Sequence, residues 1–203
     1  DTIEEGDIVY FVCNKRDLPA INYLFEFEKE PPKKVFILGG GRVGEALARN
    51  LAGLGLRVKL IERDPDLCAR LAEELDNVVV LNTDGTDVET LNHEGIAECD
   101  AYVGVTPDEQ ANILCSLLAK SYGAKRAIAL VGRHELVALA PSLGVDACVS
   151  SRQATASAVL KYVRPLGVAS LVTIEHSNSE VLEVVVPSES PIAGKPLKDL
   201  RIP

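Results

Sequence analysis

The sequence of 203 residues contains no methionine, only three histidines and no long apolar run. A helix that crosses a bilayer needs ~20 consecutive apolar residues, and no stretch of the chain approaches that length. The N-terminus also lacks the basic and apolar regions of a signal peptide. These absences predict a soluble, cytosolic chain. Because no initiator methionine is present and the chain opens with DTIEEGD, which resembles the middle of a module, we expect a fragment of a longer protein.

The chain also lacks an excess of basic residues. Its 21 Lys and Arg stand against 30 Asp and Glu, which gives a formal net charge of −9 at pH 7. The field of such a chain repels the phosphates of nucleic acids and of anionic lipids. We therefore expect no nucleic acid partner.

Paired cysteines are absent as well. The five cysteines are widely spaced, form no CxxC pair and are odd in number, so the pattern indicates neither a zinc site nor a disulfide framework. We expect ordinary buried thiols in a reducing compartment. These residues are Cys13, Cys68, Cys99, Cys115 and Cys148.

From Val35 onward, short apolar runs alternate with amphipathic stretches of helical spacing. The runs lack strict polar alternation, which is typical of strands covered on both faces. This rhythm predicts an α/β fold, a Rossmann-type doubly wound parallel sheet. The predicted strands are 35–38, 58–61, 78–81, 101–105, 127–131 and 147–149.

Both ends of the chain differ from this central rhythm. A charged stretch with a double proline at 28–34 suits an exposed linker, and a second linker is expected at 176–179. We therefore divide the chain into a partial module at 1–30, the Rossmann domain at 35–175 and a truncated module at 180–203. The remaining predicted elements are strands at 8–13, 170–174 and 180–186, and helices at 18–27 and 152–163.

A glycine-rich turn, Gly39 to Gly44 (GGGRVG), directly follows the first predicted strand and has the pattern G-x-G-x-x-G. In a dinucleotide-binding turn, Gly39 permits the tight turn, Gly41 lets the backbone approach a diphosphate, and Gly44 lets the helix pack closely. The helix N-terminus then offers free N–H groups and partial positive charge to phosphates. The strand before the turn and the helix after it supply the context that this motif needs.

The second predicted strand ends in Glu62. A carboxylate at this place can accept hydrogen bonds from the ribose hydroxyls of an adenosine, whereas a 2′-phosphate would bring two negative charges together. The pattern favours NAD(H) or an adenosine phosphate over NADP(H). Arg63, the next residue, leaves NADP(H) possible, because an arginine can bind a 2′-phosphate.

Two further loops follow predicted strands and therefore reach the edge of the sheet where ligands bind. One contains Asp84 and Gly85, and the other contains Thr106. Each side chain has two interpretations, because Asp84 and Thr106 also have the chemistry of a helix cap. The sequence does not choose between a ligand contact and a cap.

Together these residues resemble the RCK/KTN family of nucleotide-binding regulators of potassium transport. The residues that carry the resemblance are GGGRVG at 39–44, IERD at 61–64, TDGTD at 83–87, EGI at 94–96 and VTPDEQANI at 105–113. The ends are similar too, because 2–12 resembles the close of the family's RCK_C subdomain and 180–200 resembles the opening of another.

The resemblance implies a cytosolic regulatory subunit, a homodimer or larger oligomer, bound to a membrane-embedded potassium channel or transporter subunit. Bound NAD(H), ATP or ADP would bias its conformation. It implies that the glycine-rich turn holds the phosphates, Glu62 and Arg63 lie at the ribose, Asp84 and Gly85 lie at the adenosine end, Thr106 lies near a second ribose, and Arg133 reaches phosphate from the rim. The turn residues concerned are Gly39, Gly41, Arg42, Val43 and Gly44.

The alternative is an NAD-dependent oxidoreductase whose catalytic domain is missing. Such an enzyme needs a proton donor or acceptor beside the nicotinamide. The available histidines are His93 in a predicted helix, His134 at a helix start and His176 in a linker, and none follows a strand with an orienting carboxylate. We therefore predict a regulator and not an enzyme.

Overall fold

The computed structural model describes residues 3, 9, 13–24, 32–163, 168–173, 180–196 and 200. The predicted strand at 8–13 and the predicted linkers at 28–34 and 176–179 lie wholly or mostly outside these residues. None of the helices described has both the length and the apolar character that a membrane span requires.

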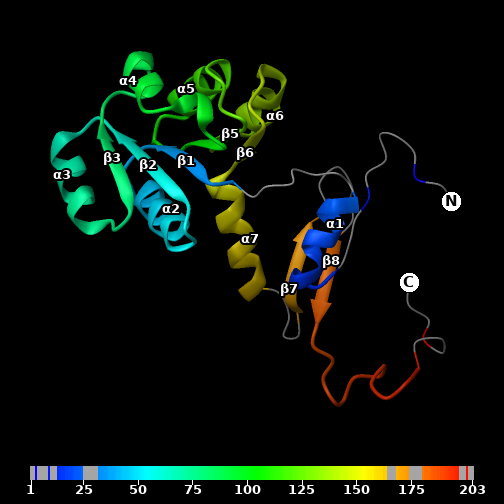
Figure 1. Cartoon of the computed structure of the whole chain (residues 1–203). Coiled ribbons are helices and arrows are strands. Elements are labelled where there is room, and N and C mark those ends of the chain that lie inside the picture. The colour runs from blue at the N-terminus through cyan, green and yellow to red at the C-terminus, as the bar shows by residue number, and fades with distance from the viewer. Residues whose placement is uncertain are drawn as a thin grey trace.

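Helices and strands alternate through the central part of the chain, as the sequence predicts (Figure 1). Short 3-10 helices lie at Lys15–Asp17 and Ile96–Glu98. The main elements are α1 (Leu18–Leu24), β1 (Lys34–Leu38), α2 (Arg42–Gly53), β2 (Arg57–Glu62), α3 (Pro65–Glu74), β3 (Val78–Asn82), α4 (Val88–His93), β4 (Ala101–Gly104), α5 (Glu109–Ser121), β5 (Ala127–Leu130), α6 (His134–Leu143), β6 (Ala147–Val149), α7 (Ser151–Val163), β7 (Val168–Thr173) and β8 (Glu180–Val184).

Strands β1 to β6 form one sheet in the order β3-β2-β1-β4-β5-β6, and every neighbouring pair is parallel. This is the predicted Rossmann-type sheet. The chain runs outward from β1 to β3 and then returns to the other side of β1 with β4. Loops at the carboxyl ends of β1 and β4 therefore separate from each other, and this switch point is where open α/β sheets bind ligands.

The sheet has an apolar layer on each face, which explains why its strands are continuous apolar runs. On one face Ile37 and Leu60 pack with residues of α2 and α3, such as Leu71. On the other face Phe36 and Tyr102 pack with residues of α4 and α5. All five of these side chains are almost fully buried. The two layers hold the strand ends in fixed positions below the glycine-rich turn.

Helix α7 leaves the sheet after β6 and extends away from it toward the β7–β8 pair (Figure 1). Strands β7 and β8 pair antiparallel with each other and form a separate two-stranded sheet. The predicted helix at 152–163 is confirmed and begins one residue earlier, at Ser151, and the helix predicted at 18–27 is described up to Leu24.

The expectation for the cysteines is correct for three of them and wrong for one. Cys68, Cys99 and Cys115 are buried and Cys148 is half-buried, but Cys13 is exposed. Cys13 precedes the short helix α1 and is not part of either apolar layer of the sheet. Burial raises the pKa of Cys99 and of Cys115 to about 11, so both thiols are neutral at physiological pH.

Candidate functional site

The glycine-rich turn after β1 has a shape that only glycine permits at two of its positions. Gly39 has φ +106, and its N–H donates to the Ile61 carbonyl at 2.8 Å. Gly44 lies in the first turn of α2, where a Cβ atom would come 1.8 Å from the Gly39 carbonyl oxygen. The tight turn and the close helix packing expected of these two glycines are therefore both present. At Gly44 the close contact is between α2 and the Gly39 carbonyl of the turn.

Gly41 is different, because the space around it is open. A Cβ atom built there meets no atom within 4 Å, and its backbone is extended with φ −65. Gly41 is the N-cap of α2, and because it has no side chain it accepts no capping hydrogen bond from the first turn of this helix. Free N–H groups at a helix start favour an anion in the space in front of them.

The neighbouring helices do not offer this arrangement, because an aspartate caps each of them. Asp64 accepts from the N–H groups of Asp66 and Leu67 at the start of α3. Asp87 accepts from Thr90 in α4, and Asp108 accepts from Ala111 in α5. These carboxylates satisfy the helix N–H groups and oppose a second negative charge at the same place.

Glu62 turns back from the end of β2 toward the glycine-rich turn. Its Oε2 accepts from the Gly40 N–H at 2.8 Å, and its Oε1 accepts from the N–H groups of Arg63 and Asp64 at 2.8 and 3.0 Å. The carboxylate therefore joins the loop after β1 to the loop after β2. Oε1 has two donors and Oε2 has one, so Oε2 keeps capacity for one further donor.

The loop after β3 brings Asp84 to the same place. Asp84 Oδ1 accepts from the N–H and the hydroxyl of Thr86 at 2.8 and 2.6 Å. These bonds hold the pKa of Asp84 below its usual value, so the carboxylate is charged at neutral pH. Since Asp87 caps α4, Asp84 does not serve as that cap. A Cβ at Gly85 would lie 2.6 Å from a methyl group of Leu38 and 3.2 Å from the Cys115 sulfur, so a larger residue there would displace these side chains of the cavity wall.

The hydroxyl of Thr106 is occupied within its own loop. It donates to Asn112 Oδ1 at 2.7 Å and lies 3.2 Å from the Asp108 N–H. The Asn112 amide nitrogen donates to the carbonyls of Thr106 and Leu130 at 3.0 and 2.9 Å. Fully buried Asn112 thus fixes the start of α5 against the ends of β4 and β5. The sequence interpretation missed Asn112, because one asparagine inside a helical run gives no signal.

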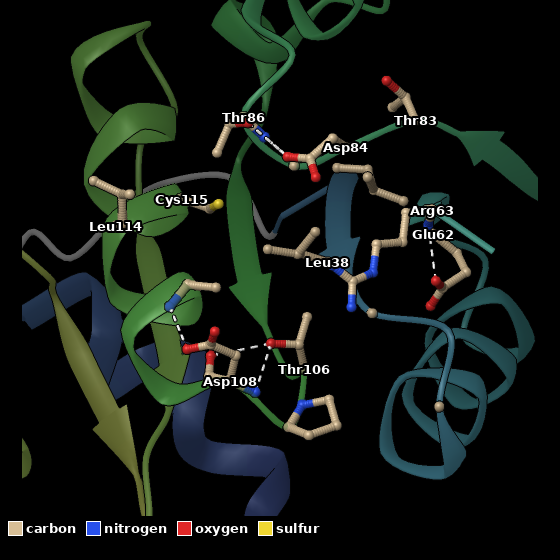
Figure 2. Close-up of a pocket in the computed structure, with 16 residues that line it drawn as sticks. Leu38, Glu62, Arg63, Thr83, Asp84, Thr86, Thr106, Asp108, Leu114 and Cys115 are labelled. Atoms are coloured by element: carbon tan, nitrogen blue, oxygen red, sulfur yellow. Dashed lines mark hydrogen bonds between the residues drawn. The ribbon is translucent and has the colours of Figure 1, made fainter.

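These loops and α5 enclose a cavity of about 470 Å³ at the switch point (Figure 2). Its described lining residues are Leu38, Gly39, Gly41, Ile61, Glu62, Arg63, Thr83, Asp84, Gly85, Thr86, Thr106, Pro107, Asp108, Ala111, Leu114 and Cys115. Apolar side chains of β1, β2 and α5 form one part of the wall, and carboxylates and hydroxyls form the other. Such a mixture suits a ligand with a flat apolar ring and polar substituents.

Most of the predicted residues line the cavity. Those that do are Gly39, Gly41, Glu62, Arg63, Asp84, Gly85 and Thr106, and those that do not are Arg42, Val43, Gly44 and Arg133. The side chains of Arg42 and Val43 are exposed at the start of α2, outside the cavity lining. Arg133 is the N-cap of α6, and its Nε lies 3.4 Å from Glu109 Oε2.

Sequence reasoning missed the apolar wall that α5 contributes. Leu114 is 53% exposed and Cys115 is almost fully buried, and both lie at the cavity. The helical spacing around Leu114 predicts a core position, so only its exposure in the folded structure distinguishes it. Of the described lining residues none is a histidine, and His93 lies exposed at the end of α4.

A protein-family model described as the TrkA-N domain matches residues 35–151 of this chain. This range covers the six-stranded sheet except its first residue, Lys34, and all of the described residues that line the cavity. The chain belongs to the TrkA-N domain family. The resemblance to the RCK/KTN group that the sequence motifs indicated is thereby confirmed.

Similar proteins of known name point in the same direction. The chain is 36% identical to the Trk system potassium uptake protein TrkA homolog 2 of Methanosarcina mazei, over 100% of this chain and 46% of that protein. It is also 36% identical to the Trk system potassium uptake protein TrkA of Haemophilus influenzae, over 99% of this chain and 44% of that protein. The chain therefore spans about half the length of the curated relatives that it matches.

Solved structures with the same fold include the TrkA-N domain of the inner membrane protein YbaL from Escherichia coli. Its TM-score is 0.59 at 18% identity, with 66% of this chain and 99% of that chain covered. The structure of GsuK bound to ADP has a TM-score of 0.55 at 26% identity, over 65% of this chain and 34% of that chain. The GsuK channel bound to NAD has a TM-score of 0.58 at 17% identity, over 77% and 29% of the two chains.

Proposed function

We propose that this chain is the nucleotide-binding part of a cytosolic regulatory subunit of a potassium transport system. It binds NAD(H), ATP or ADP at the switch-point cavity, and the bound nucleotide biases the conformation of a membrane-embedded channel or transporter partner. The observation that carries the proposal is the convergence of an uncapped helix N-terminus, Glu62 and Asp84 on one cavity. The names of the relatives support a role in potassium transport, and the ADP and NAD in the GsuK structures support the ligand class.

The cavity favours binding without chemistry. Its described titratable residues are Glu62, Arg63, Asp84, Asp108 and Cys115. Asp84 is held as a carboxylate by Thr86, and Cys115 is held as a thiol by burial, so neither exchanges a proton near neutral pH. A ligand that is not consumed acts only through its different affinity for two states, with a coupling of typically ~1–3 kcal/mol.

The proposal is tested with the purified protein reconstituted with its membrane partner in potassium-loaded vesicles. Addition of ADP, ATP or NADH should change the potassium flux several-fold, and the nucleotide recovered afterwards should be chemically unchanged by mass. Turnover of NADH with any small carbonyl substrate would contradict the proposal and favour an oxidoreductase. A potassium flux that does not change when any of these nucleotides is added would contradict the proposal as well.

The division of the chain also remains part of this proposal. Residues 1–30 would close one RCK_C-like module, 35–175 would form the nucleotide domain and 180–203 would open a second module. In a tandem arrangement of this kind, a nucleotide that closes the cavity can move the neighbouring modules relative to each other.

The first prediction concerns the choice between NAD(H) and NADP(H). Glu62 should make NADH bind at least about tenfold more tightly than NADPH, because the 2′-phosphate would lie against its carboxylate. Titration calorimetry on the parent and on Glu62→Gln gives both affinities. The neutral variant keeps one acceptor oxygen for the turn, so its preference should shrink. Equal affinities for the two cofactors in the parent protein would contradict this role of Glu62.

The second prediction concerns oligomerisation through α7. Val159 and Leu160 are 52% and 44% exposed on this helix, and alanines precede them at 154, 156 and 158. We expect α7 to mediate a homodimer, because close helix packing would bury these side chains. Analytical ultracentrifugation should show a dimer at micromolar concentration that Val159→Asp dissociates. Leu54→Asp, which charges another exposed apolar residue at the end of α2, should leave the dimer intact. A monomeric parent protein would overturn the prediction.

A further inference from the structure

The cavity does not extend equally over the two halves of the sheet. In a doubly wound sheet, a dinucleotide places one nucleotide over each half, on the two sides of the switch point. The first half here is β1 to β3, and its strand-end loops contribute Glu62, Arg63 and Asp84 to the cavity. The second half is β4 to β6, and it contributes the loop after β4 and the adjacent face of α5.

The cavity stops at that loop. Within the described stretch 32–163, the residues that follow β5 are Val131, Gly132 and Arg133, and those that follow β6 begin with Ser150. None of these residues lines the cavity. A ligand group placed beyond Thr106 and Asp108 would therefore lie outside the space that the described residues line.

Side chains of the protein occupy the region next to the end of β5. Glu109, in the first turn of α5, lies so close that a Cβ on Gly132 would come 2.8 Å from its Oε1. Its Oε2 lies 3.3 Å from the Arg133 N–H nitrogen and 3.4 Å from Arg133 Nε. Arg152 at the start of α7 approaches the same point, with its Nε 3.4 Å from that Cβ position.

Two interactions hold Glu109 beside Arg133. Buried Asn112 ties α5 to the Leu130 carbonyl at the end of β5, so the Glu109 backbone has a fixed position. Although burial opposes it, the N–H groups and guanidinium at Arg133 lower the pKa of Glu109, so its charge persists at neutral pH. An ionic contact thus occupies the surface at the end of β5, in the half of the sheet over which a bound dinucleotide would place its second nucleotide.

The first half, in contrast, offers a cation, Arg63, whose charge helps to lower the pKa of Asp84. The Arg63 side chain extends into the cavity toward Leu38 (Figure 2), and none of the described residues forms an ion pair with it. A guanidinium in this place matches the phosphate oxygens that Gly41 and the start of α2 would hold. Adenosine and two phosphates therefore find complementary groups within the cavity.

We propose that this site recognises only the adenosine diphosphate part of its ligand and leaves any group attached to the second phosphate in solvent. The proposal rests on the proposed function, since it concerns the same cavity. It follows that the oxidised and reduced forms of NAD bind alike. The site then reports adenine nucleotide concentration and not redox state.

Calorimetric titration of the nucleotide-free purified protein with ADP, ADP-ribose, NAD⁺ and NADH tests this. All four dissociation constants should agree within about fivefold, since groups in solvent add little to affinity. A difference above about fivefold between NAD⁺ and NADH, or tighter binding of NADH than of ADP-ribose by that factor, would overturn the proposal while leaving the regulatory function intact. Failure of all four to bind would instead remove the proposed function.

Two variants distinguish the halves of the sheet. Arg63→Ala should weaken ADP about tenfold and adenosine much less, because the lost partner is a phosphate. Arg133→Ala is the matched control in the second half and should leave both ADP-ribose and NADH unchanged. If Arg133→Ala weakened NADH but not ADP-ribose, the nicotinamide would be in contact with the protein and the proposal would be wrong.

Discussion

Replacing Gly44 with alanine is expected to destabilise the domain by at least about 3 kcal/mol, or to prevent its folding. The added methyl group would lie 1.8 Å from the Gly39 carbonyl oxygen and 3.3 Å from a Val105 methyl group. The first of these is a backbone atom, so no side-chain rotation relieves the overlap. The turn would have to open or α2 would have to move away from β1. Either change removes buried apolar contact between the helix and the sheet.

Urea denaturation followed by circular dichroism measures this effect. Gly53→Ala is the matched control, because Gly53 is in the same helix and a Cβ there meets no atom within 4 Å. An alanine in a helix is ordinarily favoured over glycine by about 0.5–1 kcal/mol, so this control should be as stable as the parent or slightly more stable. A Gly44→Ala variant with the parent's denaturation midpoint would show that the turn is not as tight as the structure indicates.

The sheet is predictable from sequence because its signals are local. Apolar runs such as 35–38 and 58–61 have no polar alternation, and the turns between elements contain glycine or capping aspartates. The observed strands β1 and β2 differ from these runs by a single residue at some ends. Such small differences reflect where the last ladder hydrogen bond forms, which composition does not determine.

The polar half of the site is predictable for the same reason. Gly39, Glu62 and Asp84 each lie at the end of a strand or within two residues of it, and the carboxyl ends of parallel strands meet at one edge. The double interpretation of Asp84 and Thr106 could not be resolved at that level. Only the folded chain shows that Asp87 and Asp108 are the caps, that Asp84 faces the cavity and that the Thr106 hydroxyl bonds to Asn112.

The remainder depends on contacts between distant segments. Leu114 and Cys115 reach the cavity because α5 crosses the sheet beside Leu38, and helical spacing alone assigns Leu114 to the core. Arg133, in contrast, was predicted to reach the ligand but does not line the cavity. It follows a strand like the others, yet Glu109 of α5 draws its guanidinium toward α5 and outside the cavity lining. Tertiary ion pairs of this kind leave no mark in the sequence.

Replacing Gly41 with leucine should abolish nucleotide binding while the protein stays folded. The extended backbone at Gly41 accepts any residue, and a Cβ there has no neighbour within 4 Å, so stability should change little. The leucine side chain would instead fill the space in front of the α2 N-terminus, where the phosphates would approach the free N–H groups. We expect the affinity for ADP to fall by about 100-fold or more, since a charged group loses its only close approach to these donors.

The same variant tests which cavity controls transport. In vesicles that contain the membrane partner, Gly41→Leu should assemble normally but should no longer change potassium flux when nucleotide is added. Gly53→Leu, at the open far end of the same helix, should retain both binding and response. If Gly41→Leu lost binding and the flux still responded, another nucleotide site in the assembly would be the sensor. If it bound ADP as the parent does, the phosphates would lie elsewhere, because a leucine side chain and a phosphate cannot share the space above Gly41.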